Sequence, residues 1–376
     1  MNEKEDINQP KKKTGKRNLF NRFAMFFNHI AAVCLLIAYM APHVSPENFW
    51  FIAFFGLAYP LFVILNILFV IYWAAQLKKR ALYSLILIFS GWLQLHAYFQ
   101  VNFNHGGADK HKIKVMSYNV KVFDLYNWSR NVETRDNMFN LINDEHTDIM
   151  CLQEFFSRDS SKLNNLDSML TFRNTRYAHV EYTTTVKRIH HWGIATFSNY
   201  PIIKKGKITF DTKSNNLCIF TDVVIAKDTV RIYNMHLQSI HFDYEDYQFV
   251  EDVMNNKETE EIAKSKNILK RIKRAFVKRA RQSDIVAAHI AASPYPVIVC
   301  GDFNDTPASY TYTTIRQKLK DSFIESGNGF GRTYVGKFPS FRIDYILHSR
   351  EFNSFDFQTV RQELSDHYPV TCTIEL

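Results

Sequence analysis

The sequence is poor in cysteine and glycine, and both shortages exclude classes of protein. Its 376 residues include 5 cysteines and 12 glycines, with no Cys-x-x-Cys pair. Zinc ribbons and thioredoxin-type motifs need such a pair, and a nucleotide-binding loop needs a glycine cluster after a strand, which is missing. Four cysteines lie in apolar, strand-like runs, so we expect buried free thiols, although an extracytoplasmic location would permit a disulfide. These are Cys151, Cys218, Cys300 and Cys372.

Three long runs in the first hundred residues have no Asp, Glu, Lys or Arg. They cover 23–41, 49–73 and 82–101. A bilayer core about 30 Å thick needs roughly 20 apolar residues as helix, so each run has a suitable length. A cleaved signal peptide would have a shorter apolar region and no further apolar runs after it. We therefore expect three transmembrane helices that attach the chain to a lipid bilayer, preceded by a basic cytoplasmic tail at 1–22.

The charges that flank these runs indicate their orientation. Several Lys and Arg residues precede the first run, the 42–48 loop has none, and 78–80 is entirely basic. By the positive-inside rule the N-terminus and the second loop are cytoplasmic, so three crossings place the remaining chain outside the cytoplasm. The third run is the most polar, and if it re-enters or lies in the interface, the remaining chain is cytoplasmic. Its least apolar members are Gly91, Gln94, His96 and Gln100.

The rest of the chain reads as one mixed domain. A short polar segment at 102–112 is expected to be a tether, and after it β-rich runs alternate with segments of helical character. This mixture over 113–376 predicts an α/β or α+β domain with a buried sheet core. The expected strands are 113–120, 148–155, 193–198, 216–225, 229–237, 296–303, 342–347 and 368–376, and the expected helices include 134–143 and about 247–292.

Polar side chains gather where these strands begin or end. The clearest case is "VCGDFNDTP" (299–307), in which two carboxylates, an amide and a glycine follow an apolar run. Each such residue has an ordinary explanation alone, such as an Asx turn for Asp302 and Asn304 or a hydrogen-bonded core position for His236. Their conjunction and order favour a catalytic site at a sheet edge. The full set is Asn119, Glu154, His236, Asp302, Asn304, Asp344, Asp366 and His367.

The motifs around these residues carry a family resemblance. "SYNV", "LQE", "GIATFSNYPI", "NMHLQS", "GDFNDTP", "RIDYIL" and "SDHYPV" follow one another in this order. The series resembles that of the endonuclease/exonuclease/phosphatase superfamily, including its DNase I-like, sphingomyelinase-like and abasic-site-endonuclease-like members. The resemblance covers about 113–376. It implies an α/β DNase I-like sandwich of two sheets flanked by helices, and phosphoester hydrolysis assisted by a divalent metal, Mg²⁺ or Mn²⁺ in its place.

The chemistry explains the residue types in this set. Phosphodiester hydrolysis requires a positive partner for the developing charge, an activated water and help for the leaving oxygen. Mg²⁺ prefers oxygen ligands and keeps several waters, so one or two carboxylates can hold it. By its match to the family's metal glutamate, Glu154 is the expected main ligand. Asn119 is expected beside it as a ligand or orienting group, and the resemblance places Asp366 near the metal.

The other members of the set have expected catalytic roles. Asp302 orients or deprotonates the attacking water, and Asn304 donates its amide to a phosphate oxygen. His367 contacts the phosphate, and the resemblance assigns Asp344 as the carboxylate that sets its tautomer. His236 matches the family's second histidine, which implies a hydrogen bond to the phosphate or to the leaving oxygen.

Lys121 departs from part of the family pattern. Abasic-site endonuclease relatives have a metal-binding aspartate two residues after the motif asparagine, where this chain has Lys121. A cation at this position opposes a second nearby metal. The departure argues against a two-metal site and against abasic-site repair.

A basic run and the apolar runs leave the substrate open. Nine of the eighteen residues in 264–281 are Lys or Arg and none is acidic, which is typical of a solvated helix face but also fits phosphate polymers or anionic lipid headgroups. A nuclease or phosphodiesterase is favoured by analogy with the superfamily. A phosphodiesterase or phosphatase for lipid headgroups is the alternative. Acidic residues upstream would weaken the basic field, and these are Glu251, Asp252, Glu258, Glu260 and Glu261.

A third hypothesis is a catalytically inactive membrane scaffold. It is disfavoured because the polar set is complete, and a scaffold does not require such a set. No segment of the sequence indicates a protein partner.

Overall fold

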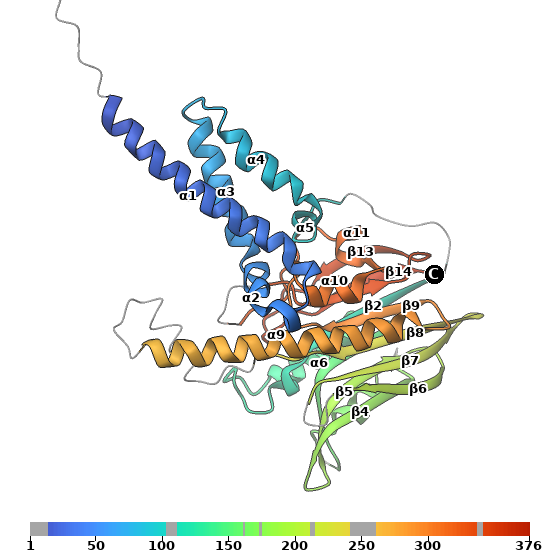
Figure 1. Cartoon of the computed structure of the whole chain (residues 1–376). Coiled ribbons are helices and arrows are strands. Elements are labelled where there is room, and N and C mark those ends of the chain that lie inside the picture. Colours follow the sequence, from blue (N-terminus) through green and yellow to red (C-terminus); the bar gives the residue numbers. More distant parts are fainter. Residues whose placement is uncertain are drawn as a thin grey trace, which may run out of the picture.

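In the part of the chain that the structure describes, two six-stranded β-sheets pack face to face (Figure 1). The computed structural model describes residues 14–102, 111–160, 162–172, 175–210, 215–240, 261–336 and 341–376. The first sheet has, in spatial order, β10 (Lys320–Asp321), β12 (Asp344–His348), β9 (Val297–Asp302), β8 (Asp228–His236), β7 (Leu217–Ile225) and β6 (Ile202–Thr209). The second has β13 (Asn353–Thr359), β14 (Val370–Glu375), β2 (Lys112–Asn119), β3 (Ile149–Arg158), β5 (His190–Ser198) and β4 (Tyr177–Val186).

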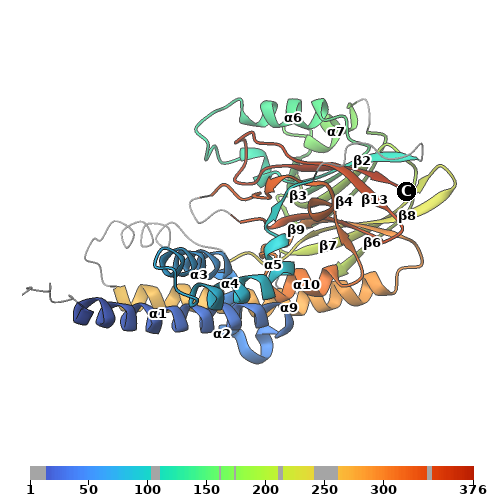
Figure 2. The same ribbon diagram turned by 90° about the horizontal axis from the view of Figure 1, so that it is seen from above.

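The central strands are apolar on both faces because each sheet is covered twice. Between the sheets, Val115 and Cys151 of the second sheet pack with Ile232, Cys300 and Ile346 of the first. Outside the first sheet lie α9 (Glu261–Ala291) and α10 (Tyr310–Arg316), and outside the second lie α6 (Thr134–Asp144) and α7 (Asn165–Leu170) (Figure 2). The expected α/β sandwich flanked by helices is confirmed, and all the described cysteines are free, with the four domain thiols buried.

Every expected strand is present, but six further strands of the described residues were missed, and the three longest of them share a reason. β4, β6 and β13 each form an edge of their sheet. β6 alternates little and is mostly exposed, with the sequence IIKKGKIT. Edge strands can be polar on one side and along their free edge, so they lack the continuous apolar run that marks the central strands. Of the long expected helix, α9 accounts for 261–291, and the part before 261 lies outside the described residues.

The N-terminal region is helical but does not form three continuous spans. Its elements are α1 (Thr14–Met40), η1 (Ala41–His43), α2 (Pro46–Leu57), α3 (Tyr59–Ala74), α4 (Ala81–Ser90), α5 (Trp92–His96) and β1 (Phe99–Gln100). In the described residues, one helix, Leu19–His43, is long and apolar enough to cross a membrane. The pair α2 and α3 reaches this length only if it is counted as one span across a 50° bend. The structure therefore supports one candidate span, or two with the bent pair.

The expected third span at 82–101 is wrong as a continuous helix. α4 has 10 residues and ends at Gly91, so it is about 15 Å long at the usual rise, half of a bilayer core. After α5, Phe99 and Gln100 pair as a strand with Phe330 and Gly329 of the sandwich, in β11 (Gly329–Phe330). A partner more than two hundred residues away in sequence thus determines the backbone conformation of this segment.

The lower end of the helical region, as seen in Figure 1, contacts the sandwich. α1, α3 and α4 extend away from the sheets, whereas α2 lies against α9 and η1 lies against α10 (Figure 1). Of the expected tether, 103–110 lie outside the described residues, as do 1–13 of the expected tail. Asn102 is attached to the sandwich, since its side-chain amide donates to the carbonyls of Gly327 at 2.8 Å and Ile324 at 3.2 Å.

Candidate active site

Strand register brings three of the expected residues to one level of the first sheet. His236 at the end of β8 pairs in register with Asp302 at the end of β9, and Asp302 pairs with Asp344 at the start of β12. Directly opposed positions on adjacent strands have side chains on the same face. Gly301 permits the close approach of β9 to β8, because a Cβ there would lie 2.2 Å from the Met235 carbonyl oxygen and its φ is +149°.

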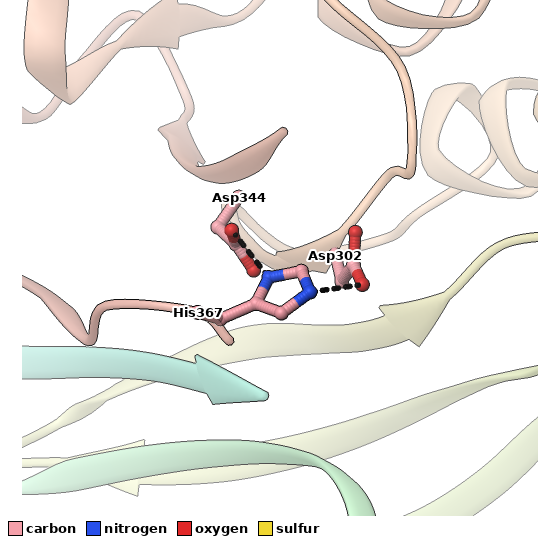
Figure 3. A group of neighbouring side chains, drawn as sticks. All are labelled: Asp302, Asp344 and His367. Carbon is pink, nitrogen blue, oxygen red and sulfur yellow. Dashed lines mark hydrogen bonds and ion pairs between the residues drawn. The ribbon is translucent and has the colours of Figure 1, made fainter. Parts of the chain in front are cut away.

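His367 lies between the two carboxylates of this sheet. Its Nδ1 donates to Asp344 Oδ2 at 2.9 Å, and its Nε2 is 3.7 Å from Asp302 Oδ2 (Figure 3). Burial lowers the pKa of His367, but Asp344 and Asp302 outweigh burial, so the pKa is raised well above its ordinary value. Burial also raises the pKa of Asp302, although His367 opposes that shift. The three groups therefore retain a shared proton at pH values above the ordinary pKa of histidine.

The second sheet supplies the open half of the site. A β-bulge between Leu152 and Phe155 interrupts β3, and Glu154 within it has φ +50°. Bulges redirect a side chain at the point where a ladder is broken. Glu154 Oε1 accepts from Asn119 Nδ2 at 3.1 Å, and the same amide donates to Asp302 Oδ2 at 3.0 Å. Asn119 thus connects the carboxylates of the two sheets.

The backbone of Lys121 determines the orientation of the Asn119 amide. Lys121 N donates to Asn119 Oδ1 at 3.0 Å, so the NH₂ group of Asn119 is the part that points to the carboxylates. An oxygen ligand for a metal would require the opposite orientation. In this arrangement Asn119 orients Glu154 and Asp302.

His236 has a free ring nitrogen directed at the same place. Its Nε2 is 3.6 Å from Glu154 Oε1 and 3.7 Å from Asp302 Oδ2, beyond hydrogen-bonding distance. This buried atom has no partner among the described residues. Buried polar atoms in proteins are nearly always paired, so Nε2 is available to a bound molecule.

Asn304 is brought to the site by a tight turn after β9. It has φ +53°, and its backbone N donates to Asp302 Oδ1 at 2.8 Å. Its amide donates to the carbonyl of Leu237 at 3.0 Å and to Asp302 Oδ2 at 3.2 Å. Both amide hydrogens are therefore directed to protein acceptors, and the contact with Asp302 is the longer of the two.

Asp366 lies at the rim of the site and is paired with a cation. Lys121 Nζ is 2.9 Å from Asp366 Oδ2, and the same ammonium lies over the ring of Trp128 at 5.0 Å. Burial raises the pKa of Asp366, but His367 and Lys121 outweigh it and hold the pKa below its ordinary value. Lys121, the departure from the family pattern, thus neutralises a carboxylate that was expected near the metal.

Two supporting residues were missed from sequence. Gln153 Nε2 donates to Asn234 Oδ1 at 2.7 Å, and Asn234 donates to the Ala195 carbonyl at 2.8 Å. Both side chains are fully buried between the sheets. They are the polar neighbours of Glu154 in "LQE" and of His236 in "NMHL", and this adjacency is the signal that identifies them.

Glu154 fits a hard divalent cation better than the buried residues do. Its side chain is 36% exposed, whereas those of Asp302 and Asp344 are 1% exposed. The ligand atoms of Asp302, Asp344 and His367 also lie within 4.8 Å of one another, but Asp344 and Nδ1 of His367 already share a hydrogen. A carboxylate open to solvent lets the cation keep its waters, as Mg²⁺ prefers.

The expected site residues are thus brought together from both sheets at one edge of an α/β sandwich. The model of the endonuclease/exonuclease/phosphatase family matches residues 116–367, about two thirds of the chain. The chain belongs to this family. A second model, a domain of unknown function (DUF8431), matches residues 21–98 in the helical region.

Several solved structures of other proteins are similar to this chain. An endonuclease/exonuclease/phosphatase from Beutenbergia cavernae is 15% identical, with 71% of this chain and 72% of that chain aligned at a TM-score of 0.51, which shows a common fold. The human nocturnin catalytic domain is 19% identical over 70% and 94% of the two chains, at 0.49. TDP2 from Caenorhabditis elegans is 17% identical over 72% and 77%, at 0.48. No curated protein sequence matches the chain significantly.

Proposed function

We propose that the protein is a divalent-metal-dependent phosphodiesterase, of nuclease or related type, attached to a membrane by its N-terminal helices. The observation that carries this proposal is the placement of His367 between Asp302 and Asp344, next to the open carboxylate of Glu154. His367 and its two carboxylates can donate and accept a proton, and Glu154 can bind a cation. Phosphoester hydrolysis requires both.

The residues divide the work as follows. Glu154 would hold the cation, with Asn119 orienting the carboxylate; when bound, Mg²⁺ or Mn²⁺ supplies charge neutralisation for the phosphate oxygens. Asp302 accepts a hydrogen from the attacking water and directs the water at phosphorus. His367, kept protonated and oriented by Asp344, donates to a phosphate oxygen. His236 Nε2 donates to the phosphate or the leaving oxygen, and Asn304 exchanges its contact with Asp302 for a phosphate oxygen.

Asp366 has a conditional role in this scheme. While Lys121 holds one of its oxygens, Asp366 acts through the electrostatic field around His367. It would be able to hold the metal only if the ammonium of Lys121 were elsewhere. The proposal is therefore for one tightly held metal, in keeping with the cation at position 121.

The test uses the full-length protein purified in detergent, with Mg²⁺ and bis-p-nitrophenyl phosphate. We expect turnover that EDTA abolishes and that Asp302→Asn lowers by about a thousandfold, the middle of the range for loss of a general base. Asp284→Asn is the matched control, because Asp284 is exposed on α9 and only accepts from Tyr310. No metal-dependent turnover by the wild type would refute the proposal and favour the inactive scaffold.

A lipid headgroup is the second candidate substrate, and one observation favours it. Ala308, six residues after Asp302, packs in the same apolar cluster as Leu35, Tyr59 and Ile88 of the helical region. A membrane held by these helices would lie close to the site. Turnover of phospholipid vesicles in preference to plasmid DNA and RNA, measured with the same preparation, would select this function; the reverse order would select a nuclease.

Sidedness depends on the number of crossings. A single crossing by Leu19–His43 after the basic tail leaves the catalytic domain outside the cytoplasm, whereas a second crossing by α2 and α3 returns it to the cytoplasm. We propose the first arrangement. Alkaline phosphatase fused after Gly107 should then be active in cells, and a fluorescent protein that folds only in the cytoplasm should be dark; the opposite pair of results would contradict it.

A further inference from the structure

The helical region is packed directly on the loop that follows the catalytic strand β9. This loop, residues 303–309, is called the site loop below. In α2, a Cβ on Gly56 would lie 2.5 Å from the Ala308 carbonyl oxygen and 2.6 Å from Ala41 Cβ. Ala308 is fully buried, in a cluster that otherwise consists of residues from the helical region. Ala308 of the site loop therefore has its apolar contacts with the helices, whereas Phe303 at the other end of the loop packs in the sandwich core.

The same helix reaches the site loop by a second path through α9. Phe54 of α2 meets Phe276 edge to face at 5.1 Å between ring centroids. One turn further along α9, the fully buried Arg279 donates to Asp305 Oδ2 at 3.1 Å and to the carbonyl of Gln238 at 2.8 Å. Tyr345 donates to the Asp305 carbonyl at 2.8 Å from the other side. The basic run is thus partly structural, since its Arg279 holds the site loop.

The other carboxylate strand is tied to the helical region as well. The buried Arg342 donates from Nη2 to the Ala97 carbonyl at 2.9 Å and from Nη1 to Asp321 at 2.8 Å. Beyond the pairing of β1 with β11, Thr333 Oγ1 accepts from the backbone N of Asp344 at 3.1 Å. The N-terminal region thus contacts the segment that follows Asp302 and the segment that precedes Asp344.

From these contacts we infer that the helical region is a positioning element of the active site, and that Gly56 is the position on which this depends. A close fit of α2 against Ala308 holds the turn that orients Asn304 and Asp302. The catalytic domain is then incomplete without the helices, although the family match begins only at residue 116. The kinetic test of this inference rests on the proposed function, whereas its structural tests do not.

The first experiment compares two glycine substitutions in the full-length protein. Gly56→Ala introduces a methyl group against a backbone oxygen, so α2 and the site loop have to separate. Gly91→Ala is the matched control, since the three atoms nearest to its Cβ would all belong to the Tyr39 side chain within the helical region. We expect Gly56→Ala to lower kcat about tenfold, equivalent to about 1.4 kcal/mol, with KM within about twofold. Gly91→Ala should leave kcat within about twofold of the wild type.

Hydrogen exchange followed by mass spectrometry provides the readout that does not need activity. Peptides covering the site loop should exchange at least about tenfold faster in Gly56→Ala, while the central strands of both sheets exchange as in the wild type. Faster exchange throughout both sheets would indicate a general loss of stability and overturn the inference, as would unchanged exchange in the site loop. If the wild type hydrolyses no phosphoester, the proposed function fails, and this readout still decides the inference.

A cleavage experiment covers the case in which Gly56→Ala does not accumulate. A protease site inserted between Gly106 and Gly107 allows the chain to be cut between the helical region and the sandwich in the folded protein. We expect the fragments to elute together in detergent, held by the contacts of Gly56, Phe54 and Arg342. Separate elution would overturn the inference.

Discussion

Two buried histidines in the sandwich, His367 at the site and His179 in β4, have pKa values shifted in opposite directions. Their exposed fractions are similar, at 5% and 2%. Burial lowers the pKa of His179 to about 4, and Glu181, 3.8 Å from its Nε2, offsets this only in part. Its Nδ1 is bonded to the neutral hydroxyl of Thr221 at 2.8 Å. His367 has two carboxylates in place of that hydroxyl.

The difference shows what the active-site edge adds to an ordinary core. Burial alone disfavours a charged imidazole, which is the outcome at His179. At His367, Asp344 and Asp302 reverse the outcome, so the pKa is raised and the imidazole keeps its proton. The predictions below change one of these two histidine environments or the part of the site that lies beside His367, starting with the largest expected effect.

Asp344→Asn should remove most of the upward shift in the pKa of His367. The amide cannot stabilise the imidazolium as a carboxylate does, so the pKa of His367 should fall toward that of His179. We expect kcat to drop by about a thousandfold to ten-thousandfold, the size seen when the orienting carboxylate of a catalytic histidine is neutralised. Steady-state kinetics and NMR titration of labelled histidine measure the two effects. A loss of less than about tenfold would mean that Asp344 has no role in orienting His367.

Glu154→Gln should affect the open half and leave the histidine environment unchanged. The isosteric amide keeps the shape but lacks the charge that attracts a divalent cation. We expect the Mg²⁺ concentration for half-maximal activity to rise by at least about a hundredfold, the upper end of the effect of outer ligand-supporting groups. Activity measured over a metal titration tests this, and the same curve for Asp344→Asn should not shift. An unshifted curve for Glu154→Gln would place the metal elsewhere.

His179 should give the fold a pH dependence that His367 does not. Its pKa is lower when folded, so the unfolded chain binds the proton more tightly. The stability due to neutral His179 is therefore complete above about pH 6.5 and is lost as the pH falls toward about 4. We expect His179→Gln to reduce the change in unfolding free energy between these pH values by about 2 kcal/mol. Urea unfolding of the wild type and the variant at several pH values measures it, and parallel curves would contradict the prediction.

Lys121→Met should have the smallest effect. Removal of the ammonium frees Asp366 and removes a positive charge beside the site. We expect the metal affinity to increase by a few fold, about 1 kcal/mol for a partly exposed charge at this distance. The metal titration used for Glu154→Gln measures it, with Lys318→Met as a surface control. A weaker metal affinity in Lys121→Met would show that Lys121 supports the site and does not compete with a cation.

The sequence predicted the central strands, and the polar residues that gather at their ends, because both carry local signals. The runs before Asn119, Glu154, His236 and Asp302 are apolar, and each ends in a polar motif residue. The edge strands and the β3 bulge at Glu154 have no such signal, since pairing and register depend on distant partners.

The helical region was predicted less well for the same physical reason. Its composition indicated helices, but Gly91 and the pairing of Gln100 with Gly329 decide where they stop. Hydropathy records how apolar a segment is and not what it packs against. The contacts of Gly56 with Ala308 and of Lys121 with Asp366 likewise join residues that no spacing in the sequence connects.

Hydrolysis in water enriched in the heavy stable isotope of oxygen tests the central claim most directly. The full-length protein with Mg²⁺ should place the label in the p-nitrophenyl phosphate released from bis-p-nitrophenyl phosphate, because Asp302 in the proposed function directs water at phosphorus. The released p-nitrophenol should be unlabelled, and Asp302→Asn should form almost no labelled product. Label in the p-nitrophenol, or equal labelling by Asp302→Asn, would contradict the account.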